Sequence, residues 1–452
     1  VHINLGNCLK DRGEQDEAVA AYRKALRMRP RDHATHSNLI YMLHFHPGYD
    51  AQAIYEESRK WDELHGRPLA RLIRPHQNDP DPERPLRIGY MSPDFRRHPL
   101  ASNFLPLAVH HDHGLFRIFC YSKVRKPDAV TERLRGLTDE WREVGRMAAE
   151  QIAEQVRADR IDILVDLTMH MGNNNLLVFA QKPAPVQVAS LCSMGTTGLA
   201  AMDYRMSDPY SDPPGLNDAH YTEETIRLPD CYFCHEAPAE APSVGQAPSL
   251  AAGYVTFGSL NNFCKVTPEV LEVWGRILSG LPGSRLLIRC PAGSAREKVL
   301  KRFEARGVSA DRVEFCGTRL DWAAYMSLHN RIDIYLDPFP YSGHTTSFDA
   351  LWMGVPLVTL AGKRDVGRSG VFILSNLGLE DLIAETEEGY VRKAIALAGD
   401  GERLAAMRSG LRDRMRGSPL MDGNRYTRHV EAAYREIWRK WCAGGRSTLE
   451  RP

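Results

Sequence analysis

The sequence predicts an α/β protein in which a short all-helical segment precedes two doubly wound domains, each built on a parallel sheet. The chain of 452 residues is too long for one ordinary hydrophobic core, so more than one domain is expected. From about Leu86 onward, apolar runs of strand length alternate with stretches of helical periodicity, which is the pattern of parallel sheets covered by helices. The beginning of the chain has helical periodicity only.

The opening stretch, "VHINLGNCLKDRGEQDEAVAAYRKALRMRP", has the residue spacing of a tetratricopeptide repeat. In this repeat of roughly 34 residues, two antiparallel helices bury small and aromatic side chains against each other. The positions that match are Leu5, Gly6, Leu9, Ala18, Tyr22, Ala25 and Pro30. Because one repeat cannot bury both of its own faces, we expect it to be the end of a longer array.

Two stretches of unusual composition divide the chain. The segment "RPHQNDPDPERP" is rich in proline and charge, and the segment 235–253 is rich in Ala, Pro and Ser, so both are predicted to be linkers. We expect a repeat segment with connecting helices at 1–72, a linker at 73–84, an N-terminal lobe at 85–235, a linker at 236–252, a C-terminal lobe at 253–390 and C-terminal helices at 391–452.

Charge and hydropathy exclude several classes of protein. The net charge of +1 provides no global field for nucleic acid or for an anionic membrane. No apolar run reaches the roughly 18 residues that span a bilayer, and no signal peptide opens the chain, so a cytoplasmic protein is expected. Nine scattered cysteines favour reduced thiols over a disulfide framework.

Two clusters resemble metal or haem sites but are better explained structurally. "CYFCH", Cys231 to His235, lacks a second cysteine pair and is predicted to be part of a strand. "HHDHG", His110 to Gly114, is predicted to be a solvated turn at the end of an apolar segment.

Three loops that leave predicted strands carry candidate functional residues, because doubly wound sheets bind ligands at the carboxyl ends of their strands. The first loop carries Asn261, Asn262 and Lys265 just before a helix that begins near Thr267 and Pro268. Lys265 is therefore placed to meet an anion. Another of these loops, "SPDFRRHPL", carries His98.

The remaining loop, within "FPYSGHTTSFDALWMGVPLVT", places hydroxyl groups at a helix start beside His344. Thr345 and Thr346 there could bind a phosphate, since a helix N-terminus offers free N–H groups and positive charge. An alternative is that Thr346 and Asp349 only form a capping box, although Asp replaces the usual Glu or Gln.

Other phosphate and metal motifs are missing from the sequence. It contains neither GxGxxG after a strand nor GxxxxGK[ST], and its only Asp-x-Asp, Asp79 to Asp81, lies in the proline-rich linker. We therefore expect no metal and no cofactor; lysine, hydroxyls and a helix end would neutralise a leaving diphosphate.

Four long motifs, in order, resemble the catalytic region of O-linked N-acetylglucosamine transferases and the related SPINDLY proteins. They are "RIGYMSPDFRRHP", "MGTTGLAAMDYRMSD", "FGSLNNFCKVTPEVLEVWGRIL" and "GHTTSFDALWMGVPLVT". The resemblance runs from about Leu86 to Cys442. It implies a GT-B pair of Rossmann-like domains and an inverting, metal-independent transfer of N-acetylglucosamine from UDP-GlcNAc to Ser or Thr hydroxyls. The implied partners are a nucleotide sugar and protein acceptors, bound by the repeats and by a cleft between the lobes.

The resemblance also assigns roles to individual residues. Lys265 and Asn262 match diphosphate contacts, and Asp349 matches the aspartate that contacts the ribose. Thr345 and Thr346 match phosphate-binding threonines, with His344 of "GHTT" beside them. His98 matches a histidine discussed as a catalytic base or acceptor-site group. Base contacts are expected around 318–322.

Two departures from the family pattern affect the expected acceptor side. "CSM" at Cys192 to Met194 replaces "GYP", and "LTMHM" at Leu167 to Met171 replaces "LTGHT", with Asp166 and His170 as further candidates. Two alternatives remain open: a protein O-fucosyltransferase that uses GDP-fucose, as SPINDLY-like motifs such as "DYRMSDPYSDPP" suggest, and a repeat-based scaffold with an inactive transferase region. The histidine of "GHTT" favours UDP-GlcNAc.

Overall fold

The computed structural model describes residues 2–191, 195–236, 238 and 240–444, which fall into two compact units. We call them the Lys265 unit and the His98 unit. The Lys265 unit comprises Val1–Ala21, His44–Gly48 and Ala237–Ser418. The His98 unit comprises Tyr22–Leu43, Tyr49–Glu236 and Pro419–Pro452.

The beginning of the chain is helical, as predicted. Its elements are α1 (His2–Asp11), α2 (Gln15–Met28), α3 (His33–Leu43), α4 (Ala51–Trp61), the π-helical turn η1 (Asp62–Gly66) and the 3₁₀ helix η2 (Arg67–Leu72). Three of the small and aromatic positions that the repeat pattern singles out, Ala18, Tyr22 and Ala25, are buried on one face of α2. They recur at the spacing of a helix that packs along one side.

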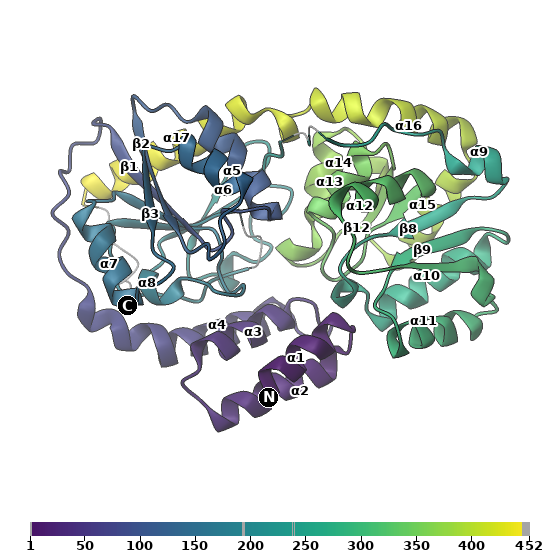
Figure 1. Cartoon of the computed structure of the whole chain (residues 1–452), viewed down its shortest axis with the longest axis horizontal. Coiled ribbons are helices and arrows are strands. Elements are labelled where there is room, and N and C mark those ends of the chain that lie inside the picture. The colour runs from purple at the N-terminus through teal and green to yellow at the C-terminus, as the bar shows by residue number, and fades with distance from the viewer. Residues whose placement is uncertain (1, 192–194, 237, 239, 445–452) are drawn as a thin grey trace. The chain divides into compact units, whose positions relative to one another are not determined.

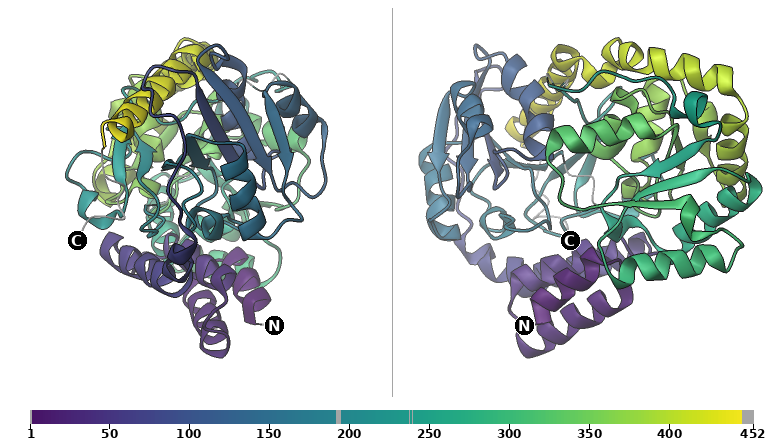
Figure 2. Two further views of the ribbon diagram at one scale, coloured as in Figure 1. Left: turned by 90° about the vertical axis from the view of Figure 1, so that its left-hand side faces the viewer. Right: turned by 45° about the vertical axis from the view of Figure 1, so that its right-hand side comes forward.

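The His98 unit is built on one seven-stranded parallel sheet (Figures 1 and 2). Its strands lie in the order β3-β2-β1-β4-β5-β6-β7. Their bounds are β1 (Leu86–Ser92), β2 (Phe116–Ser122), β3 (Glu140–Glu143), β4 (Ile163–Asp166), β5 (Val186–Ala189), β6 (Tyr204–Ser207) and β7 (Glu224–Arg227). The helices are α5 (Pro99–His110), α6 (Ala129–Gly136), α7 (Ala149–Ala158), α8 (Leu176–Phe179) and α17 (Gly423–Cys442), with the 3₁₀ turns η3 (Asp218–His220) and η9 (Pro419–Met421). Because helices cover such a sheet, the central strands β1, β4 and β5 are almost wholly buried.

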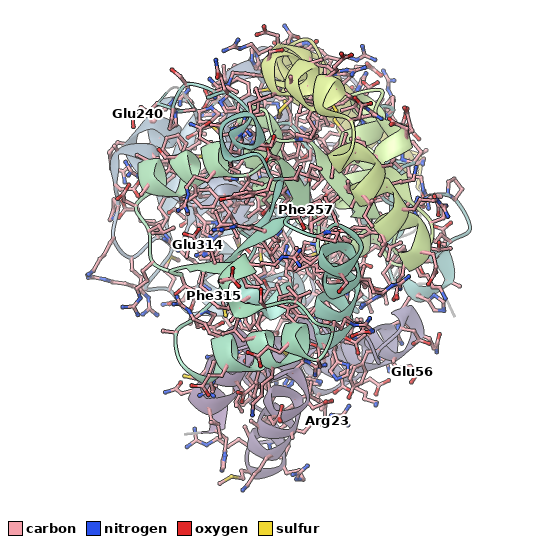
Figure 3. The ribbon with its side chains drawn as sticks, turned by 90° about the vertical axis from the view of Figure 1, so that its right-hand side faces the viewer. Arg23, Glu56, Glu240, Phe257, Glu314 and Phe315 are labelled. Carbon is pink, nitrogen blue, oxygen red and sulfur yellow. The ribbon has the colours of Figure 1, made fainter. Side chains whose placement is uncertain are left out.

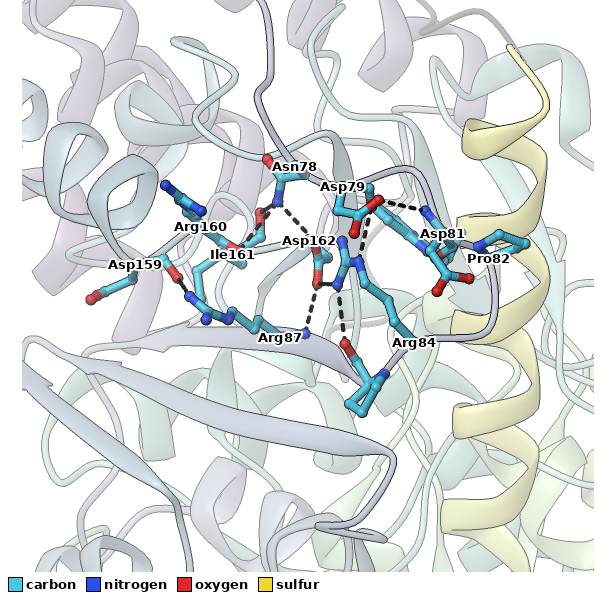
Figure 4. Close-up of polar contacts among 12 residues, drawn as sticks. Asn78, Asp79, Asp81, Pro82, Arg84, Arg87, Asp159, Arg160, Ile161 and Asp162 are labelled. Carbon is cyan, nitrogen blue, oxygen red and sulfur yellow. Dashed lines mark hydrogen bonds and ion pairs between the residues drawn. The ribbon is translucent and has the colours of Figure 1, made fainter.

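Asp162, immediately before β4, holds the proline-rich segment against the start of this sheet (Figure 4). Its carboxylate accepts hydrogen bonds from both Nη atoms of Arg84, at 2.7 and 2.8 Å, and from Asn78 Nδ2 at 2.7 Å. It also accepts one from the backbone N–H of Arg87 in β1, at 2.8 Å. The segment predicted as a linker thus has no helix or strand here but is fixed by a buried carboxylate.

The Lys265 unit is built on a second parallel sheet, with strand order β10-β9-β8-β11-β12-β13. Its strands are β8 (Thr256–Ser259), β9 (Arg285–Arg289), β10 (Val313–Cys316), β11 (Ile334–Leu336), β12 (Leu357–Leu360) and β13 (Ile383–Ala384). Its α-helices are α9 (Pro248–Ala252), α10 (Pro268–Gly280), α11 (Ser294–Glu304), α12 (Trp322–Leu328), α13 (Thr345–Trp352), α14 (Ser369–Asn376), α15 (Glu387–Ala398) and α16 (Gly401–Arg416). Short 3₁₀ turns are η4 (Phe263–Lys265), η5 (Ala310–Arg312), η6 (His329–Arg331), η7 (Asp365–Gly367) and η8 (Glu380–Leu382). Two α/β units with parallel sheets confirm the predicted fold class.

The edge of this second sheet differs from its centre in burial, and Figure 3 labels three of the residues concerned. Phe257 on the central strand β8 is fully buried, whereas Glu314 on the edge strand β10 is exposed and Phe315 is half-buried. The guanidinium of Arg296 lies 5.2 Å from the ring of Phe315, and Arg331 pairs with Glu314 at 2.6 Å. Charged side chains of this kind protect an edge strand from pairing with another chain.

The structure corrects the prediction for the cysteine cluster and one residue of the prediction for the histidine cluster. Residues 231–235 form no strand; Cys231, Cys234 and His235 are buried, and the His235 N–H donates to the carbonyl of Leu420 at 2.9 Å. In "HHDHG", His113 and Gly114 lie in an exposed turn, as predicted. His111 is instead buried, because its ring lies between the Tyr90 hydroxyl at 2.8 Å and the Glu431 carboxylate at 3.1 Å. Apolar alternation and a turn-like composition do not reveal these partners, which come from the far end of the chain.

Two further findings concern the described part of the chain only. None of its helices is long and apolar enough to cross a membrane. Its eight cysteines are all free thiols.

Candidate functional site

Two of the loops selected from the sequence meet at the carboxyl edge of the sheet in the Lys265 unit. β8 and β11 are neighbours at the centre of the sheet, although β9 and β10 come between them in the chain. The strands after β8 continue toward one edge of the sheet and those after β11 toward the other. Ligands of open α/β sheets bind at such a reversal of strand order. Lys265 follows β8, and residues 337–346 follow β11.

Lys265 reaches from its own loop to the loop after β11. Its Nζ donates a hydrogen bond to the carbonyl of Ser342 at 2.7 Å and lies 4.3 Å from the ring centroid of Tyr341. Burial lowers the pKa of Lys265 to about 8, with Cys264 and Asp337 acting in the opposite direction. The ammonium group is therefore still charged at neutral pH, and it is poorly hydrated, which strengthens its attraction for an anion.

Asp337, at the carboxyl end of β11, fixes the turn that leads into α13. Its carboxylate accepts hydrogen bonds from the Gly343 N–H at 2.7 Å, from the Thr359 hydroxyl at 2.8 Å and from the Ser347 hydroxyl at 3.3 Å. Burial raises the pKa of Asp337 to about 6. Position 343 has to be glycine here, because an added Cβ would collide with the side chains of Ser347 and Asp337.

The start of α13 is organised differently from a capping box. The helix begins at Thr345, its N-cap is His344, and the His344 side chain makes no capping hydrogen bond. Thr346 donates its hydroxyl proton to Asn261 Oδ1 at 2.7 Å instead of capping. Asp349 lies further along the helix and accepts from Tyr325, so the capping-box interpretation is wrong. Hydroxyl groups at this helix start are thus held by partners outside the helix.

Asp349 is a buried carboxylate beside the segment expected to contact a nucleobase. The hydroxyl of Tyr325, on α12, donates to Asp349 Oδ2 at 2.9 Å. Burial raises the pKa of Asp349 to about 7. Just before α12, the carbonyl of Thr318 accepts from Arg289 Nη2 at 2.6 Å. One carboxylate oxygen is therefore occupied by Tyr325, and the chemistry of the other suits a sugar hydroxyl.

The structure brings together most of the residues that the sequence predicts in this half of the chain. Lys265 and Thr346 belong to one hydrogen-bonded group of loops, and His344 packs on Phe372, with ring centroids 5.7 Å apart. Asn262 is exposed, whereas the amide of its buried neighbour Asn261 bonds Thr346.

Sequence reasoning missed Asp337, Tyr325 and Tyr341. A signal existed for Asp337, since an acidic residue directly follows the apolar strand "IYL". No comparable signal exists for the two tyrosines, which come from separate elements.

His98 caps a helix at the carboxyl edge of the other sheet, in the His98 unit. It is the N-cap of α5, and its Nδ1 accepts the Leu100 N–H at 3.2 Å. Its side chain is 32% exposed and lies 3.9 Å from the Asp94 carboxylate. Burial lowers the pKa of His98, and Asp94 opposes that shift. Because Nδ1 is an acceptor here, a neutral His98 carries its proton on Nε2, and this atom is a hydrogen-bond donor.

The two other candidates of the His98 unit have structural partners. His170 is buried; its Nε2 donates to the Thr197 carbonyl at 2.9 Å, and its Nδ1 accepts from the Ser37 hydroxyl at 3.1 Å. Asp166, at the end of β4, accepts from the backbone N–H groups of Thr168 and Met169. Burial raises the pKa of Asp166 to about 7. The "CSM" departure, residues 192–194, lies outside the described residues. Within them, no group of three or more His, Cys, Asp or Glu side chains could hold a metal ion.

Comparison with known proteins identifies the family profile that this chain matches. The profile of glycosyl transferase family 41 matches residues 64–240 and 243–430, and a tetratricopeptide-repeat profile matches residues 1–32. The second match confirms the repeat predicted from the sequence.

Similar proteins come from plants and bacteria. The chain is 40% identical to the probable UDP-N-acetylglucosamine–peptide N-acetylglucosaminyltransferase SPINDLY of Solanum lycopersicum, over 92% of this chain and 45% of the relative. It is 31% identical to the corresponding probable transferase SEC of Arabidopsis thaliana, over 79% of this chain and 38% of the relative. It is also similar to a mutant of the Thermobaculum terrenum O-GlcNAc transferase, with a TM-score of 0.92 and 38% identity over 98% of this chain and 85% of that one. The chain spans about half the length of the curated relatives it matches.

Proposed function

The chain belongs to glycosyl transferase family 41, and from this premise we propose that it transfers N-acetylglucosamine from UDP-GlcNAc to Ser and Thr hydroxyls of proteins. The names of its relatives and of the similar Thermobaculum structure support this donor and this type of acceptor. In the proposed reaction the acceptor oxygen forms a bond to C1 of the sugar on the face opposite the diphosphate. The C1–O bond to the diphosphate breaks, its electron pair leaves with UDP, and the proton of the acceptor hydroxyl passes to water.

The observation that carries the proposal is the position of Lys265 at the strand-order reversal of its sheet. Its ammonium group lies beside the loop that starts α13, where Thr345 supplies a hydroxyl and the helix start, Thr346 included, supplies N–H groups. A diphosphate placed here would gain negative charge as the sugar–phosphate bond breaks. A preorganised cation in a poorly hydrated site stabilises that charge without reorganising.

The other residues on the donor side take supporting roles in this proposal. Asp349 accepts a hydrogen bond from a ribose hydroxyl, and His344 lines the approach to the phosphates. Asn262 is the exposed amide of the Lys265 loop and contacts the diphosphate from solvent; Asn261 holds Thr346 in place. Charge neutralisation by Lys265 and the helix start requires no metal ion.

His98 serves the acceptor in this proposal, through the proton on Nε2. To accept a proton at Nε2, a neutral His98 would have to change tautomer and give up the hydrogen bond that caps α5. We therefore propose that His98 donates a hydrogen bond from Nε2 to the oxygen of the acceptor hydroxyl. His98 would thereby orient this hydroxyl without removing its proton. The helical repeat at the beginning of the chain is proposed to contact the acceptor protein.

A thermal-shift titration tests the donor. A ligand that binds only the folded state raises its stability with the logarithm of ligand concentration over Kd. UDP and UDP-GlcNAc should stabilise the protein in the presence of EDTA, and Lys265→Ala should remove this effect. Stabilisation by GDP and GDP-fucose alone would mean a fucosyltransferase instead, and dependence on a divalent ion would contradict the metal-free site. Binding of UDP without any transfer to protein would indicate an inactive scaffold.

A further inference from the structure

The short loop that carries Lys265 is held by residues from the beginning of the chain. Gln15, at the start of α2, donates from Nε2 to the carbonyl of Cys264 at 2.9 Å, and this hydrogen bond is buried. Gly13, in the turn between α1 and α2, packs on Phe263, so that an added Cβ would lie 3.1 Å from the ring. Gly13 also has a φ of 72°, which favours glycine. All of these residues belong to the Lys265 unit.

A second contact reaches Lys265 through an aromatic pair. Phe45 is buried and stacks on Tyr341, with ring centroids 4.6 Å apart and an interplanar angle of 10°. The ring of Tyr341 in turn faces Lys265 Nζ at 4.3 Å, and the neighbouring Ser342 carbonyl accepts from the same atom. Phe45 lies in His44–Gly48, the short piece between α3 and α4 that belongs to the Lys265 unit.

We propose that Gln15 and Phe45 are positioning residues for Lys265, so that the helical segment at the beginning of the chain completes the phosphate-binding site. The proposal rests on the function proposed above, because it assumes that Lys265 meets the diphosphate. It assigns this segment a role in the transfer step in addition to any contact with the acceptor protein.

The geometry explains why both contacts are needed. Gln15 fixes the backbone carbonyl directly before Lys265, and Phe45 fixes the ring on which the ammonium group rests. A displacement of about 1 Å in a positioning group can cost roughly 100-fold in rate. The ring face of Tyr341 also favours the charged form of the lysine, because an ammonium group is attracted to an aromatic face.

The titratable groups around this lysine are Cys264, whose thiol has a pKa raised by burial, and Asp337, while Lys10, Asp11 and Lys265 act on Cys264. None of them is altered in the variants below, so a changed pH dependence would report on the ring. Other contacts between the same segments provide a control. Lys298 pairs with Glu14 at 2.9 Å on the surface, with the lysine side chain 59% exposed, and such pairs contribute little to stability.

The test uses the full chain and three variants: Gln15→Leu, Phe45→Leu and Lys298→Ala. Gln15→Leu and Phe45→Leu should each lower kcat about 10-fold or more with a smaller change in KM for UDP-GlcNAc. Phe45→Leu should also lower, by about half a pH unit, the pH above which UDP affinity declines, because the ring of Tyr341 is no longer held against the ammonium group. Lys298→Ala should behave like the wild type.

Folded Gln15→Leu and Phe45→Leu proteins with wild-type kcat and an unchanged pH dependence would overturn the proposal. If Gln15→Leu does not fold, Phe45→Leu decides, because a loss of stability alone does not shift the pH dependence of UDP affinity. A wild-type protein that fails to bind UDP would instead refute the proposed function. The two failures are therefore distinguishable.

Discussion

The two units contain the same seven-residue pattern, Arg-Ile-Asp-Ile-x-x-Asp, at residues 160–166 and 331–337. In both, the pattern contains the strand at the reversal of strand order, β4 in one unit and β11 in the other. The first aspartate holds the incoming chain: Asp162 bonds Asn78, Arg84 and the β1 backbone. In the Lys265 unit, Asp333 bonds Ser249 and the backbone of Thr256 in β8.

The second aspartate of the pattern leads to different chemistry in the two units. Asp166 accepts from the backbone of the turn that follows it, and Lys123 near it donates to the carbonyls of Asn173 and Asn174. Asp337 instead holds a longer turn that ends at the start of α13, with Lys265 beside it. The shared pattern therefore builds the sheet in both units, whereas the loop that follows it in the Lys265 unit forms part of the proposed anion site.

The largest expected difference between the units is in the effect of their lysines on transfer. Lys265→Ala should lower kcat about 100- to 1000-fold with any acceptor, water included, because it removes a preorganised charge on the leaving diphosphate. Lys123→Ala, the matched change in the other unit, should leave UDP affinity unchanged. Turnover assays and UDP titrations of both variants provide the comparison. Equal losses of UDP affinity would mean that the anion site is not confined to the Lys265 unit.

The shared first aspartate predicts similar losses of stability in both units. Asp162→Asn and Asp333→Asn each weaken several hydrogen bonds to a buried carboxylate, and each should lower the free energy of unfolding by about 2 kcal/mol. Urea denaturation followed by circular dichroism measures this effect. The control is Asp81→Asn, whose carboxylate is exposed and which should change stability by less than about 0.5 kcal/mol. A neutral Asp333→Asn would show that the pattern is not used equally.

The smallest expected effect concerns His98 on the other sheet. Asparagine is among the preferred N-cap residues, so His98→Asn should preserve α5 while removing the donor at Nε2. Transfer to a protein acceptor should fall about 10-fold, the value of one hydrogen bond, and UDP affinity should not change. A loss of roughly 100- to 10,000-fold would instead indicate a general base. His98→Ala should in addition lower stability by about 1 kcal/mol.

The fold could be predicted from the sequence because strand and helix periodicities are local properties. The loops of the site could be predicted too, since parallel strands all end at one edge of their sheet. The sequence does not predict which side chain of a loop points inward. Asn261 rather than Asn262 reaches Thr346 because of the short turn η4, which no periodicity reveals.

Other errors have the same origin in distant partners. Residues 231–235 alternate like a strand but bond to Leu420, and His111 is buried by Glu431. Asp349 has the spacing of a capping residue, yet it is bonded to Tyr325 of another helix. Each of these partners lies more than one element away in the chain.

The proposed transfer depends most on one contact, that of the partly buried ammonium group of Lys265 with the donor's diphosphate. The free lysine has a pKa of about 8, and a bound diphosphate favours its charged form. The affinity for UDP should therefore stay nearly constant from pH 7.5 to about 8 and then fall about tenfold per pH unit. Asp337 and Asp349, with pKa values of about 6 and about 7, are mostly ionised throughout this range.

Calorimetric titration of UDP into the full chain, in EDTA and between pH 7.5 and 9.5, measures this dependence directly. If Lys265 binds the diphosphate, affinity declines above about pH 8 in the wild type, and binding to Lys265→Ala is much weaker and independent of pH. Wild-type affinity that does not change across this range, or that Lys265→Ala retains, would contradict this contact.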